Sequence, residues 1–151
     1  MSCGSFFCFA LSNDGKLYAW GKNNYGQAAS GTQKQDLKVL NPLELGLPYK
    51  VKDIFAGEDH SALITEDGEA YTWGYGLDGR LGNGNKQNMF SPKKANLPEK
   101  VKKIACGGNH TAFLGESGNL YMCGNGRNGE LGRGDLLESQ SVQRTEPLLV
   151  N

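Results

Sequence analysis

The chain has 151 residues, enough for one domain with a substantial core. Its 16 Lys and Arg residues balance 16 Asp and Glu residues, so the net charge gives no general attraction to nucleic acid or to acidic membranes. No apolar run approaches the roughly 20 residues that a membrane-spanning helix needs, and no basic segment precedes the apolar stretch 6–11. Neither a membrane partner nor a signal peptide is therefore expected.

Glycines mark a pattern that occurs three times along the chain. The second copy spans 57–84 and the third spans 107–134, whereas a less regular first copy runs from Gly4 to Gln27. Sets of glycines keep register at spacings of 53 and then 50 residues: Gly4, Gly57 and Gly107; Gly15, Gly68 and Gly118; Gly21, Gly74 and Gly124; Gly26, Gly79 and Gly129. A fixed period of this length is typical of repeat architectures, in which the unit determines the fold.

Each copy contains a strong hairpin signal. In the middle copy, β-rich runs at 61–65 and 70–74 flank Asp67-Gly68, where glycine supplies the positive φ of a tight turn. A further strand candidate, 51–56, precedes this hairpin, and the first copy lacks a counterpart to it.

A proline-marked segment at 92–95 follows the hairpin and is matched with 42–45 and 147–150. Proline favours the start of a strand or an edge strand. No window carries a helical period, so the sequence predicts an all-β fold. Short strands with a period near fifty predict a partial β-propeller of about three blades, each a four-stranded antiparallel sheet.

The two regular copies share the pattern Gly-x-x-His-Ser/Thr-x-x-Leu/Phe, then Gly-x-x-Tyr-x-Trp/Cys-Gly, then Gly-x-Leu-Gly-x-Gly. This pattern closely resembles the regulator of chromosome condensation repeat. The resemblance covers essentially the whole chain, which is interpreted as one repeat domain, 1–151, with copies at about 3–55, 56–105 and 106–151. The first copy departs from the pattern, because Phe7 stands where the other copies have histidine.

Members of this family usually close a ring of seven blades, so the resemblance implies that three copies leave two apolar blade faces uncovered. Exposed apolar faces of that size are rarely tolerated on a monomer. Three explanations stay open: the chain is part of a longer ring, a protein partner caps the faces, or copies assemble as a homo-oligomer. Two chains would give a ring of six blades.

The two histidines, His60 and His110, occupy the same repeat position. A metal pair or an acid–base role is the functional alternative, but no Cys, Asp or Glu accompanies both in ligand spacing. A structural histidine that bonds backbone in a blade turn is favoured, as is core packing for the tryptophans. The positions predicted to be structural are His60, His110, Trp20, Trp73, Gly21, Gly74 and Gly124.

Each of the four cysteines is replaced in another copy by a small or apolar residue. This favours reduced core thiols over disulfides or a zinc site, and predicts an intracellular chain, in cytoplasm or nucleus. The segment 74–79 has the spacing Gly-x-Gly-x-x-Gly, but no helix is predicted after it, so a nucleotide cofactor is not expected. No catalytic residue, cofactor or metal ligand is assigned.

The stretch 80–103 holds seven Lys and Arg residues against the single acid Glu99. It is either an electrostatic contact for an acidic partner or, as favoured here, a set of lysines that protects a blade edge. The loops that follow Gly21, Gly74 and Gly124 vary between copies, as a recognition rim would. The candidate partner-binding residues are Lys86, Lys93, Lys94, Lys100, Lys102, Lys103, Tyr25, Tyr75, Asp78 and Arg127.

No nucleophile–base pair, metal set or carboxylate pair converges in the pattern, so the chain is not expected to be an enzyme. The predicted function is a non-catalytic protein-interaction module or scaffold that is part of, or completes, a larger propeller or complex. The resemblance implies an alternative, a guanine-nucleotide exchange regulator of a Ran-type small GTPase with chromatin association.

Overall fold

The computed structural model describes residues 1–31 and 38–145. This part of the chain forms three four-stranded antiparallel sheets, in the orders β1-β2-β3-β4, β5-β6-β7-β8 and β9-β10-β11-β12. The first sheet holds β1 (Ser2–Cys3), β2 (Phe7–Leu11), β3 (Leu17–Lys22) and β4 (Lys38–Leu45). The second holds β5 (Val51–Ala56), β6 (His60–Thr65), β7 (Ala70–Gly74) and β8 (Met89–Lys94). The third holds β9 (Val101–Cys106), β10 (His110–Gly115), β11 (Leu120–Gly124) and β12 (Ser139–Arg144).

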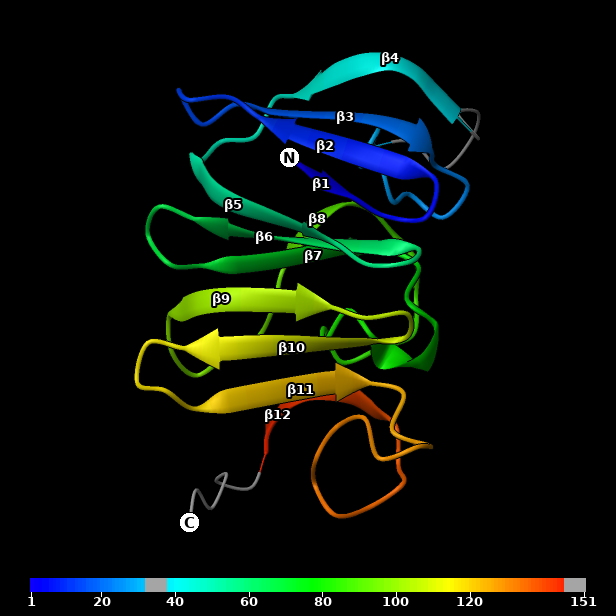
Figure 1. The fold of residues 1–151 in the computed structure, drawn as a ribbon, viewed down its shortest axis with the longest axis vertical. Helices are drawn as coiled ribbons and strands as arrows, with labels where there is room; N and C mark the ends of the chain where they lie inside the picture. The colour runs from blue at the N-terminus through cyan, green and yellow to red at the C-terminus, as the bar shows by residue number, and fades with distance from the viewer. Residues whose placement is uncertain (32–37, 146–151) are drawn as a thin grey trace.

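Each sheet is one blade, and the three blades are stacked in chain order along the long axis of the molecule (Figure 1). The all-β class and the three four-stranded antiparallel blades confirm the fold expected from the sequence. The one helical element in the described residues is the short turn η1 (Leu77–Gly79). No helix in that part of the chain is long and apolar enough to cross a membrane.

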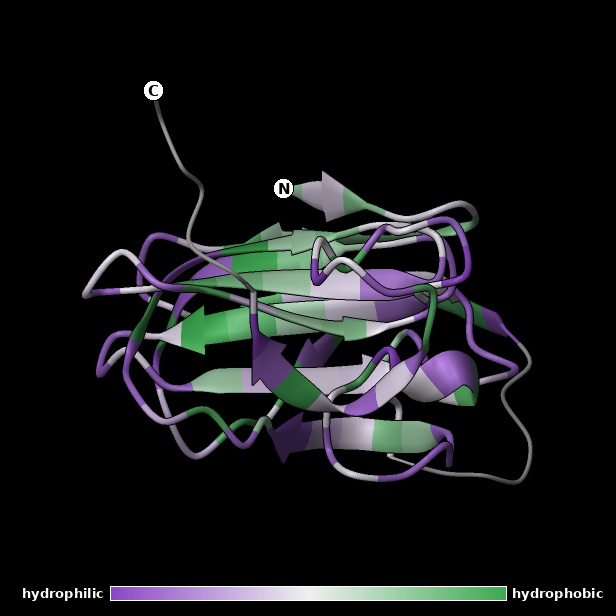
Figure 2. Ribbon diagram, turned by 90° about the horizontal axis from the view of Figure 1, so that it is seen from below, coloured by the Kyte–Doolittle hydropathy of each residue, from purple (hydrophilic) through white to green (hydrophobic). Residues whose placement is uncertain are grey.

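Successive side chains of a strand point to opposite faces of the blade, so the core is divided between the two interfaces where blades meet. One cluster joins the first two blades and includes Phe9, Leu63 and the fully buried Trp73. The rings of Phe9 and Trp73 meet edge to face at 5.7 Å. The other cluster joins the last two blades and includes Ile64 and Phe113. Figure 2 shows the hydrophobic segments concentrated on the stacked strands. The middle blade therefore buries both of its faces.

Most of the predicted strands occur where the sequence places them. The candidates 51–56 and 70–74 are confirmed as β5 and β7, and 61–65 extends by one residue to become β6. The predicted segment 92–95 contributes to β8, an edge strand, where a proline costs no ladder hydrogen bond. The first copy does have an inner strand, the two-residue β1, which pairs with β2.

The outer strand of the third blade was predicted wrongly. It is β12 (Ser139–Arg144), whereas the proposed counterpart 147–150 lies outside the described residues. Gly124 pairs with Ser139 just as Gly74 pairs with Met89, and this shared register identifies β12 as the equivalent of β8. The position equivalent to Pro92 therefore holds Val142, so the proline that marks the outer strands of the first two blades is absent from the third.

The register also explains why the two repeat periods differ. Gly21, which lies at the end of β3, pairs with Val39, 18 residues later. Gly74 pairs with Met89, and Gly124 pairs with Ser139, each 15 residues later. The three additional residues lie between the third and fourth strands of the first blade, and they account for the period of 53 against 50.

Candidate functional site

Each blade carries a glycine loop, which we define as the ten residues after the glycine at the end of its third strand: 22–31, 75–84 and 125–134. The first two of these loops join their blade to the next one. Gly26 packs against β8 so closely that a Cβ atom there would lie 2.6 Å from the Phe90 Cα atom. A Cβ atom at Gly79 would lie 2.7 Å from the Ser139 carbonyl oxygen of β12. Both glycines have positive φ, 84° and 75°. Only glycine combines this backbone conformation with so close an approach.

One backbone carbonyl in each of the first two glycine loops accepts hydrogen bonds from the next blade. The Gln27 carbonyl oxygen accepts from the Ser61 hydroxyl at 3.1 Å and from the Trp73 indole N–H at 3.0 Å. The equivalent Arg80 carbonyl oxygen accepts from the Thr111 hydroxyl at 2.6 Å and from the Cys123 thiol at 3.4 Å. These bonds satisfy polar groups that the apolar interface would otherwise leave unpaired.

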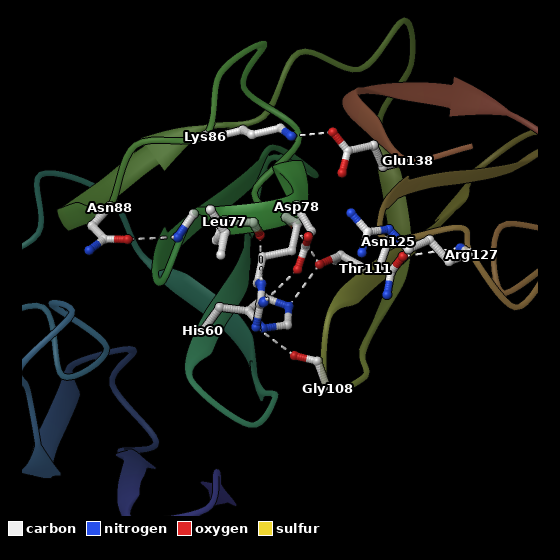
Figure 3. A network of polar contacts seen from close by, with 12 residues as sticks. His60, Leu77, Asp78, Lys86, Asn88, Gly108, Thr111, Asn125, Arg127 and Glu138 are labelled. Atoms are coloured by element: carbon white, nitrogen blue, oxygen red, sulfur yellow. Dashed lines mark hydrogen bonds and ion pairs between the residues drawn. The ribbon is translucent and has the colours of Figure 1, made fainter. Parts of the chain in front are cut away.

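His60 lies at the second interface, and its side chain is completely buried. Its Nε2 atom is 2.8 Å from the Thr111 hydroxyl, and Figure 3 shows the contact as a dashed line. Because Thr111 donates its single hydroxyl proton to the Arg80 carbonyl, the Nε2–H group must be the donor to Thr111. Burial, followed by the nearby Arg80 charge, lowers the pKa of the imidazole to about 3, so the ring is neutral near pH 7. The bonding partner is a side chain of the next blade, not the backbone of a turn.

His110, at the same repeat position, is only partly buried, because no described blade follows it. The two histidines lie on different blades, and no group of three or more His, Cys, Asp or Glu side chains in the described residues is arranged to hold a metal ion. Cys123 is buried and Cys3 is exposed, so the expectation of core thiols is right for the first and wrong for the second. All four thiols are free.

Arg80 is a structural residue that the sequence interpretation missed, because its charge groups it with the surface lysines. Its side chain is 3% exposed. The guanidinium donates to the Gly108 carbonyl at 2.8 Å, to the Leu77 carbonyl at 3.0 Å and to the Asp78 carboxylate at 3.3 Å (Figure 3). Burial lowers the Arg80 pKa from its usual value, and the Asp78 charge opposes this shift. Arg80 therefore fastens the second glycine loop to the third blade.

Tyr25 and Tyr75 come from different blades and meet above this joint. Their ring centroids are 4.4 Å apart, at an interplanar angle of 33°. The Arg80 guanidinium lies 4.7 Å from the centroid of Tyr75, and the Lys22 ammonium lies 5.3 Å from that of Tyr25. Lys22 also forms an ion pair with Asp59 of the second blade at 3.0 Å. We call Lys22, Tyr25 and Tyr75 the tyrosine surface. The structure thus brings two candidate binding residues together, with Asp78 beneath them as a partner of Arg80.

Arg127 lies apart from this surface, exposed on the glycine loop of the third blade, where its backbone N–H donates to Asn125 Oδ1 at 3.0 Å.

The six candidate lysines do not form one patch. Lys93 and Lys94 lie on β8, at the outer edge of the second blade, whereas Lys102 and Lys103 lie on β9, at the opposite edge of the third. Two of the six are already paired: Lys94 binds Glu69 at 2.7 Å, and Lys86 forms an ion pair with Glu138 (Figure 3). Lys100 is exposed in the linker before β9.

Each linker between two blades contacts the hairpin that follows it, by ring stacking in one case and by hydrogen bonds in the other. The Tyr49 ring stacks on Tyr71 at a centroid distance of 4.4 Å. At the equivalent position, the Glu99 carboxylate accepts from the Tyr121 hydroxyl at 2.7 Å and from the Ser117 backbone and hydroxyl at 2.8 and 2.7 Å. These hydrogen bonds, chiefly from Ser117, lower the Glu99 pKa to about 2. In the sequence, Glu99 differs from its neighbours only in being the single acid among lysines, which does not indicate a structural role.

An apolar pocket of about 490 Å³ opens on the first blade. Its lining residues, which define what we call the first-blade pocket, are Phe6, Gly21, Lys22, Asn24, Lys38, Val39 and Leu40. Phe6 is 73% exposed and Leu40 is 83% exposed, both unusual for large apolar side chains.

Comparison with known proteins places this geometry in a family. Over 86 residues the chain is 35% identical to the ultraviolet-B receptor UVR8 of Arabidopsis thaliana, covering 57% of this chain and 19% of that protein. Over 80 residues it is 39% identical to the protein RCC1 of Candida albicans, covering 49% of this chain and 17% of that protein. The chain spans less than a fifth of either of these relatives.

A solved structure of Prp20p from Saccharomyces cerevisiae matches 98% of this chain with a TM-score of 0.88 at 28% identity, and the match covers 38% of the Prp20p chain. That work describes binding properties of Prp20p to Gsp1p and histones. A model of the regulator of chromosome condensation (RCC1) repeat matches residues 1–27, 51–80 and 101–130. A second model of the same repeat matches residues 67–114. The chain belongs to the RCC1 repeat family.

Proposed function

We propose that this chain is a non-catalytic protein-binding module whose tyrosine surface contacts a partner. The observation that carries the proposal is the Tyr25–Tyr75 pair, which spans two blades and is held by the Arg80 guanidinium and by Lys22. Tyrosine and arginine are the residues most enriched at the energetic centres of protein interfaces.

Preorganisation supports this role. Lys22 is fixed by its ion pair with Asp59, and the Tyr25 backbone N–H donates to the Gln27 side chain at 2.9 Å. Two rings that are already ordered lose little side-chain entropy when a partner covers them. The tyrosine surface thus offers a rigid apolar patch with a cation at its edge, which suits a partner that presents an apolar side chain beside a carboxylate.

The probes for the experiment follow from the likeness to Prp20p: core histones and a nucleotide-loaded Ran-type GTPase, each titrated onto the immobilised chain. We expect at least one probe to bind, and Tyr25→Ser and Tyr75→Ser to weaken that binding by about tenfold or more, as loss of an interface anchor does. Tyr18→Ser is the matched control, because Tyr18 is a half-buried tyrosine away from this surface. Equal binding by all three variants, with unchanged circular dichroism, would contradict the proposal, as would the absence of binding to either probe.

A second candidate is guanine-nucleotide exchange on a Ran-type GTPase, favoured by the structural likeness to Prp20p over 98% of the chain. The resemblance implies that exchange factors of this type insert a wedge hairpin, whereas every strand of the described residues belongs to one of the three blades. We therefore rank exchange second. Release of a fluorescent nucleotide from the GTPase is expected to proceed at its intrinsic rate when the chain is added, and a clear acceleration would reverse this ranking.

We also propose that the lysines protect blade edges rather than bind chromatin. The variant that combines Lys93→Glu, Lys94→Glu, Lys102→Glu and Lys103→Glu is expected to bind duplex DNA as weakly as the unmodified chain does. A steep loss of DNA binding in this variant, with a reduced salt dependence, would instead assign the lysines to phosphate contacts.

A further inference from the structure

In two of the three blades, the start of the outer strand is covered by a glycine loop from the preceding blade. At the first interface, the Gly31 N–H donates to the Phe90 carbonyl at 3.0 Å while Gly26 packs on the same residue. At the second, the Gly84 N–H donates to the Gln140 carbonyl at 2.9 Å while Gly79 packs beside it. Each outer strand thus provides an equivalent binding position for the loop that precedes it. We call this position, at Phe90 in the second blade and Gln140 in the third, the seat.

The first-blade pocket is this same seat without its loop. The strand register makes Val39 the equivalent of Met89 and Ser139, since each pairs with the glycine that ends the third strand of its blade. Leu40 is therefore the equivalent of Phe90. In the second blade, Asp59 completes the seat and accepts from the Gln27 side chain at 3.0 Å. The residue at that repeat position in the first blade is Phe6, another lining residue of the pocket.

The glycine loop of the third blade fills no seat in the part of the chain that the structure describes. Gly129 has a φ of 82°, close to the values of Gly26 and Gly79, yet no atom lies within 4 Å of the position of its Cβ. Within the described residues, no donor reaches the Glu130 carbonyl, the equivalent of the carbonyls of Gln27 and Arg80. Within residues 1–31 and 38–145, the stack thus has a seat that holds no loop at one end and a loop that occupies no seat at the other.

We propose that the first-blade pocket binds the glycine loop 125–134 of a second copy of this chain, head to tail. The contact continues the joint that already connects the blades within the chain. In it, the Trp20 indole N–H donates to the Glu130 carbonyl of the other copy, as Trp73 donates to Gln27. Of the two lysines that border the pocket, Lys22 already pairs with Asp59, and Lys38 provides a favourable charge for the Glu130 carboxylate. The interface does not use the rings of Tyr25 or Tyr75.

The oligomeric state tests this contact directly. In light scattering over a concentration series, the mass of the unmodified chain is expected to rise above the 16.3 kDa of one copy. Leu40→Arg places a charge in the seat, and Gly129→Ala places a methyl group where the equivalent glycines meet backbone. Each variant is expected to stay at the mass of one copy across the series.

Matched controls separate the contact from general damage to the fold. Gly118 has a φ of 88° and, like Gly129, has no atom within 4 Å of its Cβ position. Gly118→Ala therefore imposes the same backbone strain at a hairpin turn away from the joint. Leu43 lies on the same strand as Leu40 but does not line the pocket, so Leu43→Arg is the control for the added charge. Both controls are expected to associate as the unmodified chain does.

Mixing the two variants gives the sharpest result. Leu40→Arg retains a free loop and Gly129→Ala retains an empty seat, so a head-to-tail contact restores one junction between them, and the mixture is expected to reach twice the mass of one copy. An unmodified chain that stays at the mass of one copy throughout the series would overturn the proposal. So would association that survives in both variants, or a mixture that does not associate.

Discussion

The buried imidazole of His60 makes the stability of this chain depend on pH, and the dependence has a definite sign. In the unfolded chain the imidazole pKa is the usual 6.5, whereas burial in the fold lowers it to about 3. Below pH 6.5 the unfolded chain binds a proton that the folded chain rejects. The free energy of unfolding is therefore unaffected by His60 above pH 6.5, and falls as the pH falls from 6.5 toward 3.

The size of the effect follows from these two pKa values. Between pH 7 and pH 5, protonation of the unfolded imidazole alone lowers the free energy of unfolding by about 2 kcal/mol, and the loss reaches about 4 kcal/mol at pH 3. Because domains of this size are stable by roughly 5–15 kcal/mol, one side chain makes the fold sensitive to mild acid.

Urea unfolding at pH 7 and pH 5 measures the effect, with His60→Phe as the variant. Phe7 occupies the same repeat position in the first blade and is 2% exposed, so the fold accommodates a phenyl ring there. We expect the unmodified chain to lose about 2 kcal/mol more than His60→Phe between the two pH values. His110→Phe, which changes the partly buried histidine, serves as the control and is expected to keep the full loss.

A loss of equal size in the unmodified chain and in His60→Phe would refute this reasoning. Nuclear magnetic resonance gives a second test that requires no substitution, because the His60 ring signals should stay constant from pH 7 to pH 5. A His60 titration midpoint near 6.5 would show that the imidazole is not held neutral by burial.

The remaining predictions concern the joints and the thiols. Thr111→Val removes the acceptor for the His60 N–H and is expected to cost roughly 1–3 kcal/mol in urea unfolding, whereas Thr111→Ser, which keeps the hydroxyl, should cost clearly less. Glu99→Gln is expected to lower the melting temperature at pH 7. Because the folded pKa of Glu99 is about 2, below its usual 4.5, the difference in melting temperature between the unmodified chain and Glu99→Gln should shrink as the pH falls toward 2. A difference that stays constant with pH would contradict the role of the charge. Cys3 is expected to react first with a thiol reagent, since it is exposed, whereas burial raises the pKa of Cys123 to about 12 and delays its reaction until unfolding; four equally fast thiols in the folded chain would contradict this expectation.

The strands that the sequence predicts well are those marked by glycine turns. Hairpin turns such as Asp67-Gly68 and the glycines that end the third strands fix both position and register, because a tight turn leaves few alternatives for the pairing. The third outer strand was missed because Ser139–Arg144 is mostly polar and lies at an edge, where neither alternation nor burial leaves a pattern. Its pairing with β11 is visible only in three dimensions.

The site was less predictable, for physical reasons that differ between residues. Arg80 has the charge of a surface residue, and only the structure reveals that carbonyl oxygens from two blades surround its guanidinium. Tyr25 and Tyr75 hold different positions in their repeats, so no alignment of the copies brings them together. Tyr49 and Glu99 hold the same repeat position, and each attaches a linker to the next hairpin. Tyr49 does so by stacking and Glu99 by hydrogen bonding, so a comparison of residue types between the copies does not reveal their shared role.

The joint between blades depends on a main-chain oxygen, and this has a consequence for how such chains change over time. The residue that supplies the carbonyl is Gln27 in the first blade and Arg80 in the second, and Glu130 holds the same position in the third, so the side chain there is neutral, positive or negative. Any residue provides the same oxygen. The main-chain part of the joint therefore survives a change of side chain at this position, even though the bonds that the Gln27 and Arg80 side chains add to the next blade do not. Duplicated units can diverge in these side chains while the same main-chain oxygen continues to attach each blade to the next.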